Sequence, residues 1–171
     1  MGLSVAISGG IIMFGIVYLM FSLGGVTDKI VSVSDSSIQR TDLENKLVKT
    51  SIVINIQNEN GNKPDFDIDV TNTNLEKFWE FEKFDIIATY ESSNEIYTET
   101  LNYSSTCPPV AGEWCVQSWE STDELEPGIL NYGEVVRFAV ELNRDLDHNS
   151  WLTSIVSTEN GVVATDVQKV T

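Results

Sequence analysis

The residue types that most often perform chemistry are scarce in this sequence. It contains one histidine and two cysteines among 171 residues. His148 has no nucleophile and no second metal ligand at a recognisable spacing. Asp145, Asp147 and Asn149 match the first half of a calcium-binding loop, but serine and valine replace the glycine and glutamate required further on. We therefore predict a polar hairpin loop here, and we expect no catalytic residue, no metal site, no cofactor and no enzyme.

A second group of carboxylates lies in the segment DFDIDV, where Asp65, Asp67 and Asp69 alternate with apolar residues. Three like charges on one face of a strand could hold a hard cation through their oxygens. Such a row more often forms a solvated sheet face, which also discourages pairing with the edge of another sheet. We favour the solvated face.

Two further features indicate the compartment. Cys107 and Cys115 bracket the segment PPVAGEW, and the sequence has no further soft ligands for a metal site. Two cysteines this close in a turn-rich β-domain predict a disulfide and an oxidising environment, so we expect the domain to lie outside the cell. Asn102, followed by Tyr103 and Ser104, forms a glycosylation acceptor.

The charge balance argues against one class of partner. Ten basic residues against twenty-six acidic residues give a net charge of −16. Because nucleic-acid binding depends on a basic surface, this balance excludes it as the main activity.

The N-terminal part of the chain is a long apolar segment that precedes all the residues discussed above. No charged residue occurs in residues 1–27, and the run from Leu3 to Val26 would reach roughly 36 Å as a helix, at about 1.5 Å per residue. A cleaved signal would need a basic start and a shorter core, so we predict a retained, single-pass transmembrane helix. Small residues at helical spacing predict a helix–helix contact face. These residues are Ser4, Ala6, Ser8 and Gly10.

The orientation of this helix has two conflicting signals. Lys29, Arg40 and Lys46 follow the apolar run, which by itself favours a cytoplasmic C-terminal side. The cysteine pair and the acidic, Asn/Ser/Thr-rich remainder favour the exterior. We predict an extracytoplasmic head.

The rest of the chain predicts a helical stalk and an all-β head. Neither glycine nor proline interrupts residues 26–60, so the helix is expected to continue to about residue 49. Residues 50–171 show short segments of period-two alternation separated by turn signals, which predicts two packed antiparallel sheets. The predicted strands begin near residues 52, 66, 84, 96, 114, 135, 153 and 162. The domains are therefore 1–49 and 50–171.

The order of these parts, with three short motifs, resembles the archaellar FlaF/FlaG family of archaellin-like accessory proteins of the archaeal flagellum, or archaellum. The motifs are VTNTN (70–74), PGILNYGEVVRFAVEL (127–142) and ENGVVATD (159–166). Related heads often carry glycine where Asn74 stands, and asparagine also tolerates the left-handed conformation. The resemblance implies an immunoglobulin-like β-sandwich outside the membrane, held by the N-terminal helix.

The resemblance also implies a function. FlaF-like proteins are understood to bind the surface-layer lattice, and FlaG-like proteins to assemble with them as a stationary element. We therefore expect a membrane-anchored accessory or stator subunit that binds surface-layer or other envelope protein and associates with itself or a paralogous subunit. The alternative is a filament-forming structural subunit of the archaellin or pilin type, located in an extracellular filament.

A third hypothesis is an extracytoplasmic module that binds a ligand or an ion. It needs a pocket with converging polar groups, which a sequence does not reveal. The four tryptophans could build a contact surface, but we assign them to the core or to loop anchors. They are Trp79, Trp114, Trp119 and Trp151.

Overall fold

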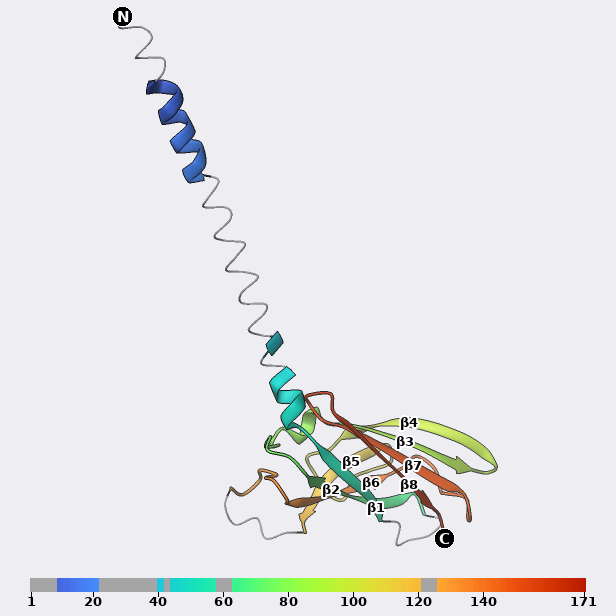
Figure 1. Cartoon of the computed structure of the whole chain (residues 1–171). Coiled ribbons are helices and arrows are strands. Elements are labelled where there is room, and N and C mark those ends of the chain that lie inside the picture. The colour runs from blue at the N-terminus through green and yellow to red at the C-terminus, as the bar shows by residue number, and fades with distance from the viewer. Residues whose placement is uncertain (1–8, 22–39, 42–43, 58–62, 121–125) are drawn as a thin grey trace, which may run out of the picture. The chain divides into compact units, whose positions relative to one another are not determined.

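The computed structural model describes residues 9–21, 40–41, 44–57, 63–120 and 126–171 (Figure 1). By its internal contacts the chain divides into two compact units, Met1–Glu44 and Asn45–Thr171. The sequence predicted a boundary after residue 49 and a membrane role for residues 1–49. That division stays a prediction.

The first unit contains a helix over residues 9–21 whose apolar side chains are exposed. Within the described residues, no helix combines the length and the apolar character needed to span a bilayer. The remainder of the expected spanning segment lies outside the described residues, as do Ser4, Ala6 and Ser8. Gly10 lies in the helix, and a Cβ added to it would contact nothing within 4 Å. The membrane span and the helix–helix contact therefore stay predictions.

The second unit is a β-domain, which confirms the predicted all-β class (Figure 1). After a short helix at its start, its described residues form eight strands and one short 3-10 helix. These are β1 (Ile52–Gln57), β2 (Asp65–Asn72), η1 (Phe81–Lys83), β3 (Asp85–Ser92), β4 (Glu95–Tyr103), β5 (Glu113–Trp119), β6 (Val135–Glu141), β7 (Trp151–Ser157) and β8 (Val163–Lys169). A short helix over residues 44–49 precedes β1 and ends where Thr50 Oγ1 donates to the Lys46 carbonyl at 2.7 Å.

The strands form two antiparallel groups that meet at one edge. One group has the order β1-β2-β6-β5, and the other has the order β4-β3-β7-β8. They join through a short parallel pairing of β4 with β5, where Asn102 faces Glu113 and Tyr103 faces Trp114. This parallel pairing differs from the expected wholly antiparallel arrangement, because alternation within a strand carries no information about its partner across a loop.

The core lies between the two groups and follows the predicted alternation. Strands β2 and β3 bury every second residue, including Ile68, Val70 and Ile86. Aromatic rings fill the centre, and the ring centroids of Trp114 and Phe138 lie 4.7 Å apart. Each large buried side chain contributes about 1.5–3 kcal/mol by leaving water, so this aromatic and aliphatic layer is the main source of stability.

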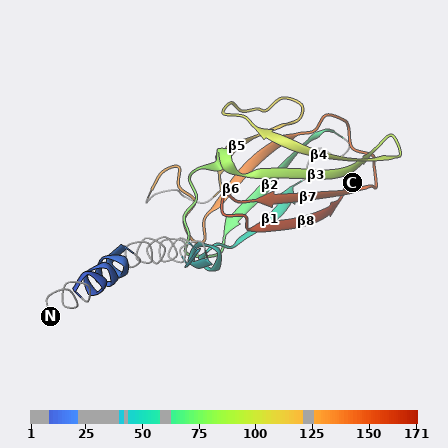
Figure 2. The same cartoon turned by 90° about the horizontal axis from the view of Figure 1, so that it is seen from above.

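The two end strands, β1 and β8, lie side by side on the other edge (Figure 2). They are not joined by a backbone ladder in the described residues. Instead, the backbone N–H of Ile56 donates to Asp166 Oδ2 at 2.8 Å. Ile56 is buried. A side-chain carboxylate thus satisfies a donor that would otherwise need a neighbouring strand.

Candidate functional site

A fully buried asparagine organises one end of the β-domain. Asn72 is the last residue of β2, and its Nδ2 donates to the Glu76 carbonyl at 2.6 Å and to the Leu130 carbonyl at 3.0 Å. Its Oδ1 accepts the backbone N–H of Asn74 at 3.1 Å. The backbone of Asn72 also pairs with the loop before β6, since its carbonyl accepts the N–H of Gly133 at 2.7 Å. One amide therefore fixes two loops far apart in sequence.

These two loops are further joined by a small antiparallel bridge. Phe78 and Leu130 exchange backbone hydrogen bonds, and both side chains are fully buried beneath the loops. Gly133 has φ of +80°, a conformation that suits glycine at this reversal. Both loops are consequently held on a rigid base.

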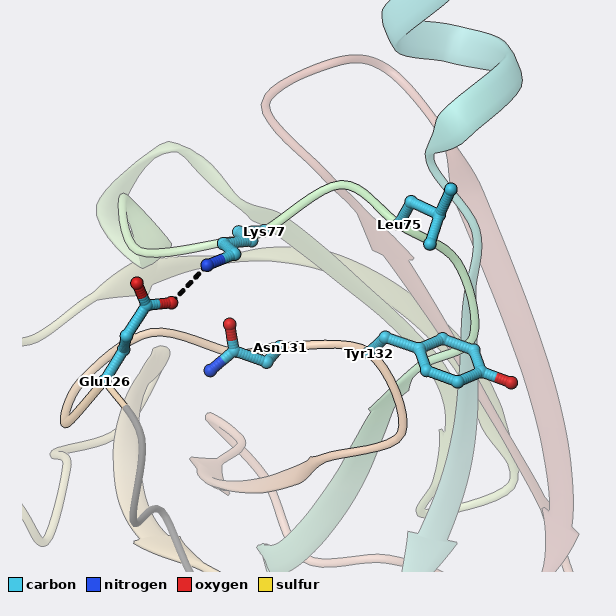
Figure 3. Close-up of a pocket in the computed structure, with 5 residues that line it drawn as sticks. All are labelled: Leu75, Lys77, Glu126, Asn131 and Tyr132. Carbon is cyan, nitrogen blue, oxygen red and sulfur yellow. Dashed lines mark hydrogen bonds and ion pairs between the residues drawn. The ribbon is translucent and has the colours of Figure 1, made fainter.

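The surface between the loops is hollowed to a volume of about 490 Å³ (Figure 3). We call this surface the loop depression, and five residues line it: Leu75, Lys77, Glu126, Asn131 and Tyr132. Lys77 and Glu126 point toward one another and form an ion pair. Leu75 and Tyr132 come from opposite loops and are 72% and 68% exposed.

The chemistry of the loop depression suits binding. Two large exposed side chains lie at one end of the depression and an ion pair lies at the other, with one amide between them (Figure 3). This is the composition of a protein contact with a polar rim. Among the residues that the structure describes, no group of three or more His, Cys, Asp or Glu side chains can hold a metal ion. The loop depression therefore combines exposed apolar side chains with an ion pair and an amide.

The polar segment around His148 has a structural role. Asp147 accepts hydrogen bonds from the backbone N–H groups of Ser93 at 2.9 Å and Asn94 at 2.7 Å. Ser93 and Asn94 have φ of 56° and 62° and form the tight turn between β3 and β4. The segment joins β6 to β7, which do not pair, so the predicted hairpin is wrong even though the loop is polar.

The predicted row of aspartates lies on the outer side of β2, as expected for a solvated face. The outward positions of the neighbouring strands add further carboxylates, and we call this surface the acidic face. It carries Asp65, Asp67, Asp69, Glu113 and Glu141, with Arg137 as its basic residue. Sequence alternation predicted the three aspartates, whereas the two glutamates join them only through strand pairing.

Charge pairing and charge repulsion coexist on the acidic face. Arg137 binds Asp69 through two bonds, Nε to Oδ1 at 2.7 Å and Nη2 to Oδ2 at 3.0 Å. These hydrogen bonds hold the pKa of Arg137 above its ordinary value. Burial raises the pKa of Glu141, and the negative charges of Asp65 and Asp145 raise it further. The ionised form of Glu141 is therefore unfavourable to the fold.

The cysteines and the glycosylation acceptor lie close together in the chain but differ in setting. A disulfide joins Cys107 to Cys115 with the Cα atoms 5.8 Å apart. Cys115 is buried in β5, while Cys107 is exposed in the loop after β4. Asn102 is exposed on β4, so its side chain is accessible to modification. Glycosylation of Asn102 stays a prediction.

The tryptophans divide between the core and the surface. Trp114 is fully buried and Trp119 packs against the core, as assigned. Trp79 and Trp151 are more than half exposed and do not belong to the core.

Sequence reasoning missed the loop depression, although the motifs VTNTN and PGILNYGEVVRFAVEL contain Asn72, Asn131 and Tyr132. Its signal was an asparagine at the end of an alternating strand, which is typical of a side chain that organises a turn.

The likeness of this chain to known proteins comes from solved structures. No family profile matches this chain, and no curated protein matches it. Among solved structures, it is similar to the archaellum periplasmic stator protein complex of FlaF and FlaG from Sulfolobus acidocaldarius, with a TM-score of 0.50 and 17% identity. That match covers 68% of this chain and 87% of the other. The chain therefore shares the fold of an archaellum stator protein.

A second solved structure is the archaellum periplasmic stator protein FlaG from the same organism. It aligns with a TM-score of 0.48 and 18% identity over 70% of this chain and 99% of the other. The resemblance to FlaF and FlaG inferred from the sequence is confirmed at the level of the fold by the first comparison.

Proposed function

We propose that this chain is a non-enzymatic accessory subunit of the archaeal motility machinery and acts in its stator. In this proposal the apolar segment anchors the chain in the cell membrane by a single pass, and the β-domain projects outside the cytoplasm. The head binds surface-layer or other envelope protein and associates with itself or with a paralogous subunit.

The observation that carries this proposal is the fold shared with the FlaF and FlaG stator complex. A mechanical role suits the structure, because torque passes only through a part that is rigid. The head has a continuous core, a disulfide and two loops fixed by Asn72. Its loop depression supplies a surface for envelope protein without any reaction being needed.

The filament alternative predicts a different phenotype. A filament subunit of the archaellin or pilin type places its helices in the axis of a fibre and its head on the outside. Deleting the gene for such a subunit removes the filament. Deleting a stator subunit leaves filaments on cells that no longer swim.

A deletion strain examined by electron microscopy and by swimming assay separates these outcomes. We expect non-motile cells that still carry filaments, with motility restored by the wild-type gene. Cells without filaments, or this polypeptide recovered from sheared filaments, would establish the alternative. Full motility of the deletion strain would refute both.

Envelope binding can be tested at the loop depression by affinity isolation from intact envelopes. We expect Tyr132→Ala and Leu75→Ala to lower the recovered surface-layer protein at least about fivefold, because exposed anchors carry most of the binding energy in such contacts. Val110→Ala is the matched control, since Val110 is also strongly exposed but lies in the loop closed by the disulfide. Equal recovery from all three variants would exclude the depression as the contact.

A further inference from the structure

The outer side of the second strand group differs sharply from the acidic face. Strand register places four outward residues in one row across β4, β3, β7 and β8, and four more in the adjacent row. The first row contains Thr100, Ile87, Ile155 and Thr165. The second row contains Thr98, Thr89, Thr153 and Val167. We call these eight residues the neutral face.

The neutral face carries no charge in a chain whose net charge is −16. The charged outward residues of these strands, Asp85, Glu91 and Lys169, lie at or next to strand ends. Two large uncharged side chains also lie at this periphery, since Ile96 is 71% exposed and Trp151 is 58% exposed. The charge of the domain is therefore concentrated away from this surface.

The neutral face is also prepared for burial. All eight side chains are β-branched, so they lose little rotamer freedom when they are covered. Thr89 and Thr98 hydrogen-bond to one another through their hydroxyl groups at 3.0 Å. A hydroxyl that already has a partner costs less to remove from water than a free one.

We propose that the neutral face is the surface through which two copies of this chain dock face to face. Two molecules of net charge −16 repel one another wherever their carboxylates approach. In a dimer with a two-fold axis, the same face of each copy forms the interface. The uncharged rows of one copy then lie against the uncharged rows of the other, and no like charges meet. A basic partner would instead be attracted to the acidic face. This names the surface for the subunit association in the proposed function and rests on that proposal.

The size of the face sets the strength of the contact. Its two rows cross four strands about 4.8 Å apart and take up about four residues of each strand at about 3.3 Å per residue, so the face spans roughly 19 by 13 Å. This area is well below the about 800 Å² per partner of a standard stable interface. We therefore expect a reversible dimer with a Kd on the order of 10 μM.

The test uses the full chain in detergent and two matched variants, measured by analytical ultracentrifugation. Thr153→Asp puts a charge in the middle of the neutral face, and Thr71→Asp puts the same charge at a half-buried outward position of β2. We expect Thr153→Asp to raise the dimer Kd at least about tenfold, because a charge would be buried without a partner. The control should dimerise like the wild type. Equal behaviour of both variants, or a monomeric wild type, would overturn the proposal.

A second measurement introduces no charge, so it does not depend on whether Thr153→Asp folds. The two cysteines of the chain are joined in the disulfide, so an introduced cysteine is the one free thiol. Thr153→Cys treated with a short bismaleimide in native envelopes should give a cross-linked homodimer, and Thr71→Cys should not. A cross-link from Thr153→Cys only to a different protein would show another occupant and refute self-docking.

The same variants separate this proposal from the proposed function. A monomeric Thr153→Asp chain that restores swimming to the deletion strain would show that self-docking is dispensable while the stator role stands. A deletion strain that swims would end the stator role without affecting a dimer measured with the purified chain.

Discussion

The side-chain amide of Asn72 forms three hydrogen bonds inside the domain, to partners on both loops that line the depression. Replacing it by alanine leaves two carbonyl groups and one N–H group without these partners. We expect Asn72→Ala to lower the free energy of unfolding by about 2–4 kcal/mol, as measured by urea denaturation. Asn55→Ala, at an exposed position on β1, should change it by less than about 0.5 kcal/mol. Similar losses for both would contradict the organising role.

Glu141 gives the domain a pH response whose sign follows from its raised pKa. A raised pKa in the folded state means that the ionised carboxylate weakens the fold, so its contribution to stability falls as the pH rises through that pKa. We expect Glu141→Gln to be more stable than the wild type at pH 7 by about 0.5 kcal/mol, since like charges across strands are unfavourable.

The advantage of Glu141→Gln should shrink as the pH falls from 7. It should vanish below the ordinary value of 4.5, where the carboxyl is protonated in both the folded and the unfolded chain. Thermal unfolding of both proteins from pH 3.5 to 7 measures this difference. An advantage that grows toward low pH would show that the sign is wrong.

At the scale of elements, the edge between β1 and β8 depends on one carboxylate. Asp166 accepts the N–H of buried Ile56, and among the described strands β1 and β8 form no backbone pairing at this edge. We expect Asp166→Ala to lower the free energy of unfolding by about 1–3 kcal/mol and to speed hydrogen exchange at the Ile56 amide. Thr165→Ala on the outward side of β8 should leave that exchange rate unchanged. Unchanged exchange in Asp166→Ala would refute the sealing role.

The elements also show what the sequence could predict. Alternation located the buried rows of β2 and β3, because period-two burial is a property of each strand alone. The parallel pairing of β4 with β5 was missed, since it depends on where two strands meet after a loop. Asp147 was assigned to a polar loop, but its partners Ser93 and Asn94 lie more than fifty residues earlier. Contacts over such separations leave no local pattern.

The loop depression was beyond sequence reasoning for the same reason. Leu75 and Tyr132 belong to two loops that show no periodicity, and contacts between residues far apart in sequence, such as the Asn72 amide bonds and the Phe78–Leu130 bridge, bring those loops together. The neutral face is intermediate in this respect. Its threonines and isoleucines follow the alternation of each strand, but their alignment into uncharged rows requires the register of four strands.

For the whole molecule, a net charge of −16 makes stability depend on ionic strength. Salt screens the repulsion among carboxylates that the folded chain brings together, while a more expanded chain keeps them further apart. We expect raising sodium chloride from about 0.02 M to 0.5 M to increase the Tm by about 3–6 °C, as measured by circular dichroism. A Tm that falls over this range would show that attractive ion pairs such as Arg137 with Asp69 outweigh the repulsion.

The outward positions of β2, β5 and β6 carry five carboxylates and the neutral face carries none, so the two outer sides of the domain differ in charge. Beside a negatively charged surface the domain does not adopt all orientations equally, because turning its carboxylates toward that surface raises the electrostatic energy. The surface exerts a turning force until the Thr/Ile/Val-rich side faces it. Any anionic sheet, whether lipid or protein lattice, therefore selects which flank of the domain it meets first.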